Sequence, residues 1–451
     1  MKPQRSTPAP LSRRAFLQRS AGAAAGLALA GGLSGCGSAL SAGLAGSPLA
    51  PGTLTYWNLF GGGDGARMQV MEDTYGKSAG AAPLQAATFT WGNPYYTKVS
   101  LATLGDAPPD LAAAHLTRQS NLARAGLLTE ITEDVLGLVG LKPGDFDPKP
   151  YDALKVDGKS YAIPFDTHPF VLYYNVDVCD KAGLLDSDGN LKPIEGTDGW
   201  EAALTAAKEV TGAYGASVAT IGDNATSWRW FQSLYSQQGG PPFLADAGAK
   251  LTYDEDLVIK TLTYIQSLTK SGLMPTETDY AGSGTLMFAG QAGFYMQGEW
   301  EITTAEAVEG LEFGMVPLPT LFDRPAAQAD SHTFVLPRQN RSDEQLLRTM
   351  TFVKSMLEQS LTWAKGGHIP AYQPTLNSTE YKSLKPQSNY ASATSTAAYD
   401  AEAWYSGSGS NFENVIGAQI GLVQQGLATP QAALAAARSQ LETYANTPSP
   451  L

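Results

Sequence analysis

One stretch of the chain, residues 158–178, sets two strand-like runs around a polar insert, and it constrains the fold more than any other. Residues 161–164 are apolar and end in a proline, and residues 171–174 are β-branched and aromatic, as is typical of buried strands. The insert between them, residues 165–169, reads Phe-Asp-Thr-His-Pro. Polar side chains between two core strands indicate contact with something outside the core. The stretch therefore predicts a buried strand that carries the chain from one lobe into another.

Length and charge limit the class of protein. At 451 residues the chain is too long for one ordinary hydrophobic core and predicts about two to three domain-sized units. With 43% hydrophobic and 16% charged residues it is expected to fold as a globular protein. The formal net charge is -13, although the first 35 residues hold five basic side chains and no acidic one. Such an acidic body is repelled by phosphate backbones, so nucleic acid is not expected as a partner.

The N-terminus has the features of an export signal. Arg13 and Arg14, followed by the weakly apolar run 21–33, are typical of a twin-arginine signal. This run is rich in glycine and alanine and is too short for the roughly 20 residues that a membrane-spanning helix needs. We therefore expect export rather than a transmembrane anchor.

The end of this signal resembles the lipobox of bacterial lipoproteins, because residues 33–36 read Leu-Ser-Gly-Cys. The resemblance implies that residues 1–35 are a twin-arginine lipoprotein signal peptide and that Cys36 carries a lipid anchor. Residues 36–52 are rich in Ser, Gly, Ala and Pro and predict a flexible tether.

After the tether, the chain alternates strand and helix patterns. Residues 53–57 alternate like a strand, residues 58–65 form a glycine-rich loop, and a helical pattern follows. Two further strand-like runs, one at 86–91 and one that ends at His115, precede helical patterns in the same way. This order predicts an α/β fold with a parallel sheet. The glycine loop lacks the spacing of a phosphate loop or a dinucleotide fingerprint, so no cofactor is expected.

Several loose motifs then occur in a characteristic order. They are residues 158–164 with 172–175, residues 290–300, residues 314–319 and residues 430–437. In this order, and together with the lipobox, they resemble family 1 extracellular solute-binding proteins, the maltose-binding-protein-like lipoproteins of bacterial carbohydrate ABC importers. The resemblance runs from residue 53 to about residue 444 and implies a two-lobe, type II periplasmic-binding-protein-like α/β fold with a central cleft.

The resemblance also implies where the lobes begin and end. The first lobe would comprise residues 53–165 and 332–367, and the second would comprise residues 169–319 and 373–451. The hinge crossings between them would be residues 166–168, 320–331 and 368–372.

The function implied is capture of a carbohydrate, a mono- to oligosaccharide, and its delivery to the permease subunits of an ABC transporter. The protein would be a monomer, held on the extracytoplasmic face of the membrane by Cys36, and it would not be an enzyme. Two alternatives stay open. The same fold could bind a peptide, a polyamine or a metal complex, or the chain could be an exported glycosidase that uses two of Asp64, Asp166 and Glu299 as its carboxyl pair.

A saccharide site pairs aromatic platforms with groups that hydrogen bond to hydroxyls. Trp300 is the first candidate, because it follows a strand where the family usually places a stacking tryptophan. Trp228 and Trp230 stand at alternate positions of a helix start, so at most one of them is expected to reach ligand. The predicted ligand-binding residues are Trp57, Phe60, Asp64, Trp91, Tyr95, His115, Asp166, His168, Trp228, Glu299, Trp300, His332 and His368.

The four histidines form a separate question. No pair has the spacing of a helical metal motif, which disfavours a zinc enzyme. On the resemblance, His168, His332 and His368 lie at or near the lobe crossings, and His115 ends a strand that points at the cleft. Their convergence could serve hydrogen bonding to the ligand or a metal site built from distant segments. Because no Cys or close carboxylate set accompanies them in the sequence, hydrogen bonding is favoured and no metal is predicted.

Overall fold

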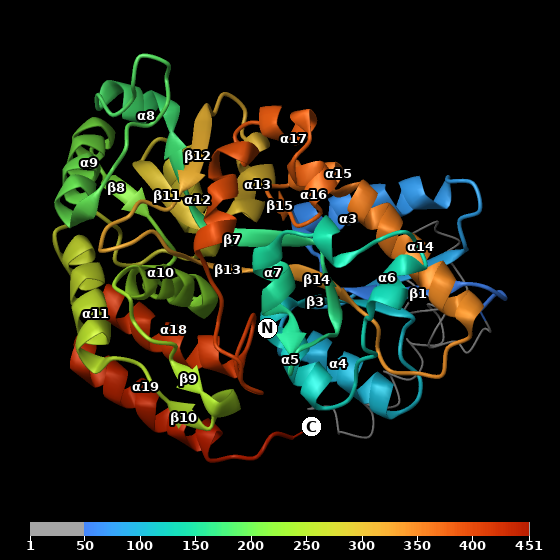
Figure 1. The fold of residues 1–451 in the computed structure, drawn as a ribbon. Coiled ribbons are helices and arrows are strands. Elements are labelled where there is room, and N and C mark those ends of the chain that lie inside the picture. The colour runs from blue at the N-terminus through green and yellow to red at the C-terminus, as the bar shows by residue number, and fades with distance from the viewer. Residues whose placement is uncertain (1–48, 451) are drawn as a thin grey trace, which may run out of the picture. The chain divides into compact units, whose positions relative to one another are not determined.

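The structure is a computed structural model that describes residues 49–450 (Figure 1). The predicted signal peptide, Cys36 and most of the predicted tether lie outside the described residues. Within residues 49–450, no helix is both long and apolar enough to cross a membrane.

The first of two sheets is built mainly from the N-terminal third of the chain. Its strands are β1 (Leu54–Asn58), β2 (Leu84–Thr88), β3 (Leu111–His115), β6 (Ala162–Pro164) and β14 (His332–Val335), in the order β2-β1-β3-β14-β6. Strands β1, β2 and β3 pair in parallel, as the alternation of strands and helices predicts, whereas β14 runs antiparallel to both of its neighbours. The helices of this lobe include α3 (Gly62–Gly76), α4 (Asn93–Leu104), α5 (Leu116–Arg124), α6 (Glu133–Gly137), α7 (Pro148–Ala153), α14 (Asp343–Glu358) and α15 (Ser360–Ala364).

The second sheet is organised around β7 (Asp166–Asn175), whose ten residues are all buried. Its other strands are β8 (Tyr214–Ser217), β11 (Ala292–Gly298), β12 (Phe313–Pro317), β13 (Ala327–Asp330), β15 (Ile369–Pro370) and β16 (Ala397–Ala398). Strands β11, β12, β13 and β15 all pair antiparallel with β7. The helices that follow in the chain are α8 (Val176–Lys181), α9 (Gly196–Thr211), α10 (Asn224–Gln237), α11 (Glu255–Lys270), α12 (Tyr280–Phe288), α13 (Ile302–Glu306), α16 (Gln373–Leu376), α17 (Thr379–Ser383), α18 (Asn411–Gln424) and α19 (Pro430–Ala445).

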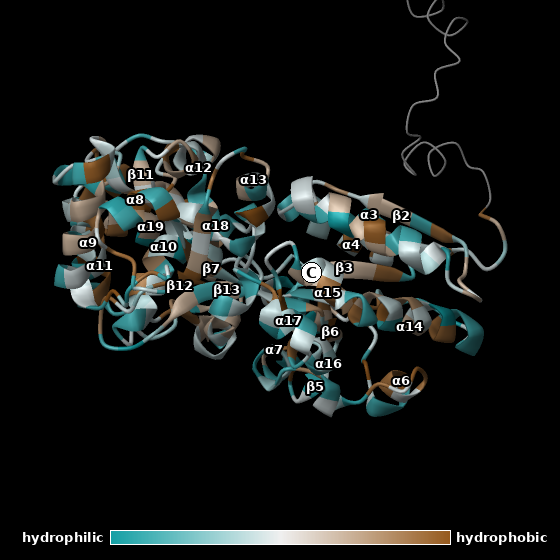
Figure 2. Cartoon of the chain, turned by 90° about the horizontal axis from the view of Figure 1, so that it is seen from above, coloured by the Kyte–Doolittle hydropathy of each residue, from teal (hydrophilic) through white to brown (hydrophobic). Residues whose placement is uncertain are grey.

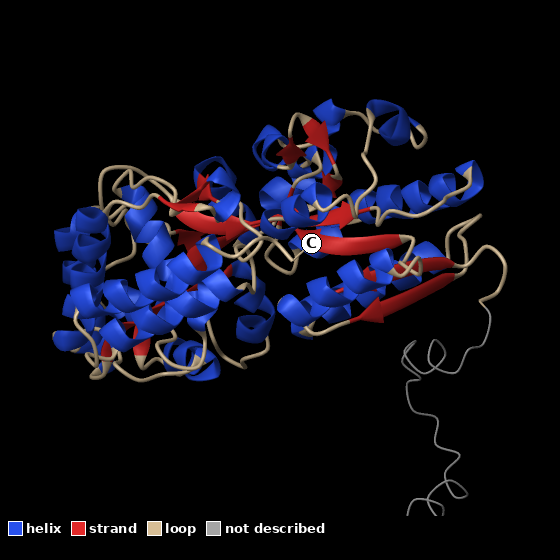
Figure 3. Ribbon diagram, turned by 90° about the horizontal axis from the view of Figure 1, so that it is seen from below, coloured by secondary structure: helices blue, strands red, loops and turns tan. Residues whose placement is uncertain are grey.

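Two short hairpins lie outside these two sheets. They are the hairpins β4 (Lys155–Val156) with β5 (Lys159–Ser160) and β9 (Leu244–Ala245) with β10 (Lys250–Leu251). Figure 3 shows helices on both sides of the strands in each half of the molecule.

Each sheet has its own hydrophobic core. Tyr56, Phe334 and Phe352 pack together in the first, and Trp228, Phe231 and Phe412 pack in the second. Helices such as α14 bury one side against these cores, and Figure 2 shows teal and brown residues mixed along them. The predicted two-lobe α/β fold is therefore confirmed.

The stretch 158–178 passes between the two sheets. Pro164 pairs with Thr333 in the first sheet, and Asp166 pairs with Pro370 in the second, so the chain changes sheets at Phe165. A second passage runs beside it, where Ser331 separates β13 from β14. The backbone N–H of Phe165 donates to the carbonyl of His332 at 2.8 Å, which holds the two passages together.

Candidate functional site

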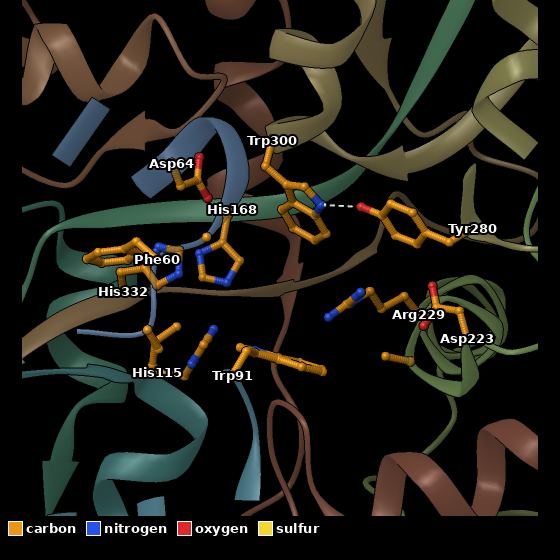
Figure 4. Close-up of a pocket in the computed structure, with 13 residues that line it drawn as sticks. Phe60, Asp64, Trp91, His115, His168, Asp223, Arg229, Tyr280, Trp300 and His332 are labelled. Carbon is orange, nitrogen blue, oxygen red and sulfur yellow. Dashed lines mark hydrogen bonds between the residues drawn. The ribbon is translucent and has the colours of Figure 1, made fainter. Parts of the chain in front are cut away.

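A cavity of about 360 Å³ lies beside the two passages, between the lobes (Figure 4). Strand ends, the loop before α3 and the first turns of α10 and α12 supply its walls. It is lined by Leu59, Phe60, Gly61, Asp64, Trp91, His115, His168, Asp223, Ala225, Arg229, Tyr280, Trp300 and His332. In Figure 4, Trp300 and Trp91 lie on opposite sides of this space, the histidines lie at one end and Arg229 at the other.

The indole of Trp300 is held at the end of β11. Gly298 permits this position, since a Cβ atom there would lie 2.0 Å from the Trp300 ring. Trp300 Nε1 donates to the Tyr280 hydroxyl at 2.8 Å, and that hydroxyl donates to Glu301 at 2.6 Å. The guanidinium of Arg229 lies over the ring, 5.0 Å from its centre. One face of this platform is therefore covered by a cation and the ring is fixed by hydrogen bonds.

Trp91 reaches the cavity from the other lobe. It precedes α4, its side chain is 40% exposed, and its Nε1 donates to Ser408 Oγ at 3.2 Å. The cavity therefore has an aromatic ring from each lobe.

Asp166 is the centre of a buried hydrogen-bond network behind the cavity. Its carboxylate accepts hydrogen bonds from the backbone N–H of His332 at 2.8 Å and from His332 Nδ1 at 2.7 Å. It also accepts from His168 Nδ1 at 3.1 Å and from Trp363 Nε1 at 2.6 Å. Burial alone would raise the pKa of Asp166, but the neighbouring imidazoles and these hydrogen bonds outweigh it and hold that pKa well below its usual range.

This network fixes the protonation of two imidazoles. Because an ionised carboxylate only accepts hydrogen bonds, Nδ1 of both His168 and His332 must carry hydrogen. The Nε2 atoms of the two rings take no part in these bonds with Asp166. Burial, followed by the unfavourable interaction with the neighbouring His332 ring, lowers the pKa of His168 to about 3, so His168 is neutral at pH 7. Burial also lowers the pKa of His115, whose Nδ1 lies 2.8 Å from the Tyr96 hydroxyl.

His368 has the opposite character. Its Nε2 lies 3.0 Å from Asp64 Oδ1, and its Nδ1 lies 3.0 Å from Glu299 Oε1 and 3.3 Å from Asp166 Oδ2. Burial lowers the pKa of His368, but these three carboxyls raise it well above its usual range. His368 is therefore a buried imidazolium. Burial raises the pKa of Glu299 to about 7 despite the opposing effect of His368.

The predicted site residues fall into three groups. Seven of them line the cavity: Phe60, Asp64, Trp91, His115, His168, Trp300 and His332. Asp166, Glu299 and His368 lie behind it in the buried network. The structure does not bring Trp57, Tyr95 or Trp228 to the cavity.

Each of these last three has another partner. Trp57 packs against Phe89 with ring centres 4.9 Å apart. The Tyr95 hydroxyl lies 2.6 Å from the carbonyl of Ala113, to which it donates. Trp228 is 1% exposed within the second core, where its Nε1 donates to Asp400 at 2.9 Å. Their positions near loops made them candidates, but Tyr95 and Trp228 are buried, and Trp57 is half-buried beside Phe89 and Lys98.

Sequence reasoning missed Asp223, Arg229 and Tyr280. In the sequence, Arg229 lies between Trp228 and Trp230, which were considered as ligand-binding residues. The geometry of the helix directs Arg229 to the cavity, while both tryptophans pack in the core. Asp223 was detectable as a helix start, since it caps α10 by accepting from Thr226 N at 3.3 Å. No sequence signal marked Tyr280.

The two lobes also touch at both rims of the cavity. On one side, Asn93 donates to Asn411 at 3.0 Å and Asn121 donates to the carbonyl of Ala403 at 2.7 Å. On the other, Arg67 contacts Thr303 and Glu306 at 3.4 and 3.7 Å. The two lobes therefore contact each other on both sides of the cavity.

Buried carboxyls near one rim predict a pH-dependent stability. Burial raises the pKa of Asp330 to about 7, and burial, with Asp400 beside it, raises that of Glu413. The folded chain binds these protons more tightly than the unfolded chain does. The contribution of these carboxyls to the free energy of unfolding is therefore complete below the unfolded pKa of about 4 and is lost as pH rises through the folded pKa values. The lowered pKa values of His115 and His168 change the free energy of unfolding only below about pH 6.5.

We therefore expect the free energy of unfolding to fall by at least about 2 kcal/mol between pH 6.5 and 8, since Glu72 and Glu299, whose pKa values burial raises to about 7, titrate in the same interval. Urea unfolding at the two pH values measures this change, and Glu413→Gln should make it smaller. Stability that rises over this interval would contradict the assignment.

Comparison with known proteins shows what this chain is similar to. The chain is 24% identical over 375 residues to the arabinooligosaccharide-binding protein of Bacillus subtilis, which covers 79% of this chain and 81% of that protein. Its fold is similar to the cyclic alpha-maltosyl-1,6-maltose binding protein of Arthrobacter globiformis, with a TM-score of 0.67 and 22% identity over 88% of this chain and 99% of that one. It is also similar to an ABC substrate-binding protein of Listeria monocytogenes in complex with cycloalternan, with a TM-score of 0.71 and 18% identity over 87% and 98% of the two chains.

The match to a protein family covers most of the chain. Residues 69–418 match the family described as bacterial extracellular solute-binding protein, in agreement with the family-level prediction from the sequence. The two-lobe fold and the cavity between the lobes fit the same assignment. The chain therefore belongs to the bacterial extracellular solute-binding proteins.

Proposed function

We propose that this protein captures a carbohydrate, a mono- to oligosaccharide, in the cavity between its lobes and delivers it to the permease of an ABC transporter. The observation that carries the proposal is the pair Trp91 and Trp300, which face the cavity from opposite sides. Sugar rings present apolar C–H faces to such platforms. The name of the Bacillus subtilis relative, an arabinooligosaccharide-binding protein, supports the same class of ligand.

The polar groups of the cavity suit the hydroxyls at the edge of a sugar. His168 offers an imidazole acceptor, because its Nδ1–H is directed to Asp166. Arg229 offers donors at the other end of the space. Hydroxyls both donate and accept, so one sugar ring can satisfy both kinds of group.

The proposal includes the location of the protein. Residues 1–35 would direct twin-arginine export, and Cys36 would carry the lipid that anchors the chain on the extracytoplasmic face. Residues 36–52 would form a flexible tether between the lipid and the folded part of the chain. The lobe limits would be those expected from the sequence, with hinge crossings at 166–168, 320–331 and 368–372. The protein would act as a monomer.

A saccharide panel tests the ligand class. We expect thermal unfolding of the protein to shift upward with one group of mono-, di- or oligosaccharides, since ligand at about 100 times its dissociation constant adds roughly 2.7 kcal/mol of stability. Arabino- and maltooligosaccharides belong in the panel, with a polyamine and a peptide mixture as controls. A shift with a control solute alone would replace carbohydrate as the class, and release of product from aryl glycosides would indicate an enzyme.

Closure of the lobes is a second, independent readout. Only the closed form can touch the solute from both lobes, so ligand is expected to shift the population toward it. Small-angle scattering with and without a saturating saccharide should then give different radii of gyration. Superimposable curves would contradict ligand-driven closure.

A further inference from the structure

Residues 406–410, which read Ser-Gly-Ser-Gly-Ser, form a loop of the second lobe just before α18. A run of serine and glycine is typical of a flexible connection. All five residues of this loop are nevertheless buried. Connecting segments almost always run over the surface, because buried backbone needs partners for its polar groups. The burial of the loop 406–410 therefore indicates that another part of the molecule covers it and bonds to it.

The loop is fixed to the second lobe at both of its ends. Before it, Tyr405 stacks on Tyr444 with ring centres 5.3 Å apart, and the Tyr405 hydroxyl donates to the carbonyl of Gly248 at 2.7 Å. After it, Phe412 packs against Trp228 in the second core. The backbone N–H of Phe412 donates to the carbonyl of Tyr405 at 2.9 Å and closes the loop at its base. The second lobe therefore holds the loop in place by itself.

The backbone of Ser408, at the middle of the loop, bonds to the first lobe. Its N–H donates to Thr117 Oγ1 at 3.0 Å, and its carbonyl accepts from Arg118 Nη1 at 3.3 Å. Both partners lie in α5. The Thr117 hydroxyl in turn donates to the carboxyl of Asp330, which leaves its oxygen free to accept from Ser408. The polar backbone groups of Ser408 are thus satisfied across the boundary between the lobes.

The loop also contacts Trp91, one of the two rings that face the cavity. Ser408 Oγ accepts from Trp91 Nε1 at 3.2 Å, the only hydrogen bond of this side chain within residues 49–450. A Cβ atom at Gly409 would lie 3.1 Å from the Trp91 ring and 2.6 Å from the Cα atom of Gly92, so only glycine allows this approach. Among the described residues, Ser408 and Gly409 lie outside the set that lines the cavity. They contact the ring of the first lobe without facing the ligand.

We propose that the loop 406–410 positions Trp91 as a ligand platform, so that this half of the aromatic pair is complete only when the lobes are closed. The inference rests on the proposed carbohydrate function. Ser408 and Gly409 are then positioning residues, which hold the ring that the sugar contacts. A side chain already held in its bound orientation loses less conformational entropy when ligand binds. Because the same contacts join the lobes, bound solute and lobe closure stabilise each other.

Gly409→Ala tests the proposal in the whole chain. Its methyl group would meet Gly92 and Trp91 in the closed form. Gly426→Ala is the matched control, because φ is +66° at Gly409 and +74° at Gly426, whereas nothing lies within 4 Å of a Cβ atom at Gly426. With the saccharide identified in the panel, we expect Gly409→Ala to raise the dissociation constant at least tenfold, mainly through faster dissociation, and Gly426→Ala to leave it unchanged. Equal dissociation constants for the two folded variants would overturn the proposal.

Ser408→Ala separates the orientation of Trp91 from the meeting of the lobes, because it removes the Oγ acceptor and keeps the backbone bonds to α5. We expect the dissociation constant to rise about threefold to tenfold, the range for one hydrogen bond. In a Trp91→Phe background, where the ring has no N–H, the same substitution should have no further effect. A rise of equal size in both backgrounds would overturn the positioning of Trp91 by Ser408.

A measurement without ligand keeps this inference distinct from the carbohydrate function. Asn93 donates to Asn411 across the same rim at 3.0 Å, so cysteines at these two positions can be joined by a short thiol cross-linker when the lobes are closed. Cys179 is buried and is not expected to react. Without saccharide, cross-linking should be slower in the Gly409→Ala protein than in the Gly426→Ala protein. Equal rates would overturn the role of the loop, whichever saccharide binds. Slower cross-linking with no shift for any saccharide would support the loop contact and overturn only the carbohydrate function.

Discussion

Asp166→Asn is expected to lower the free energy of unfolding by about 3–5 kcal/mol, the cost of breaking a buried ionic network by removing one partner. The Asp166 side chain is fully buried, and every group around its two oxygens is a donor. An asparagine amide keeps one acceptor and turns an NH₂ group toward donors such as Trp363 Nε1. The buried imidazolium of His368 also loses a counter-charge. Urea unfolding at pH 7 measures the loss.

A matched substitution separates this effect from the loss of any carboxylate. Asp186 is an exposed aspartate whose carboxylate accepts from the backbone of Asp188 and Asn190 in a turn. Asp186→Asn should leave the free energy of unfolding nearly unchanged. If Asp166→Asn were as mild as this control, the network around Asp166 would not be a source of stability.

Trp300→Ala is expected to raise the dissociation constant of the bound saccharide about 30-fold or more, which corresponds to about 2 kcal/mol for an aromatic hot spot. The substitution removes the ring that faces the cavity and the surface on which Arg229 rests. It also leaves the Tyr280 hydroxyl without the indole N–H. Calorimetric titration with the saccharide found in the panel measures the change.

Two further variants define what the ring contributes. Trp300→Phe keeps an aromatic face and should recover part of the affinity. Trp404→Ala removes a tryptophan that packs on Tyr405 and Tyr444, away from the cavity, and should leave the dissociation constant unchanged. Unchanged affinity in the folded Trp300→Ala protein would remove this residue from the proposed site.

Much of the architecture was predictable because it is encoded locally. The apolar and β-branched runs of the stretch 158–178 are strands β6 and β7, and the alternation from residue 53 onward gave the parallel part of the first sheet. Periodicity in neighbouring residues is sufficient for such predictions. The family resemblance then supplied the two-lobe arrangement, which local patterns alone do not contain.

The site was less predictable because its contacts join distant residues. The sequence predicted that the histidines converge, but the carboxylate that orients two of them is bonded to His332, 166 positions away. Trp228 and Arg229 illustrate the other limit, since only the rotation of α10 decides which of two adjacent side chains enters the core.

The position of Asp166 at the passage between the sheets has a mechanical consequence. Its partners come from β7, from β14 and from the segment around Trp363 and His368, so they meet where the chain changes sheets and not at the rims. A rotation of one lobe against the other moves atoms least near its axis. Opening should therefore break the rim bonds, such as Asn93 to Asn411, while the bonds of Asp166 persist. The Asp166 carboxylate would then lie near the axis of this rotation, and the weaker contacts at the rims would set the balance between open and closed forms.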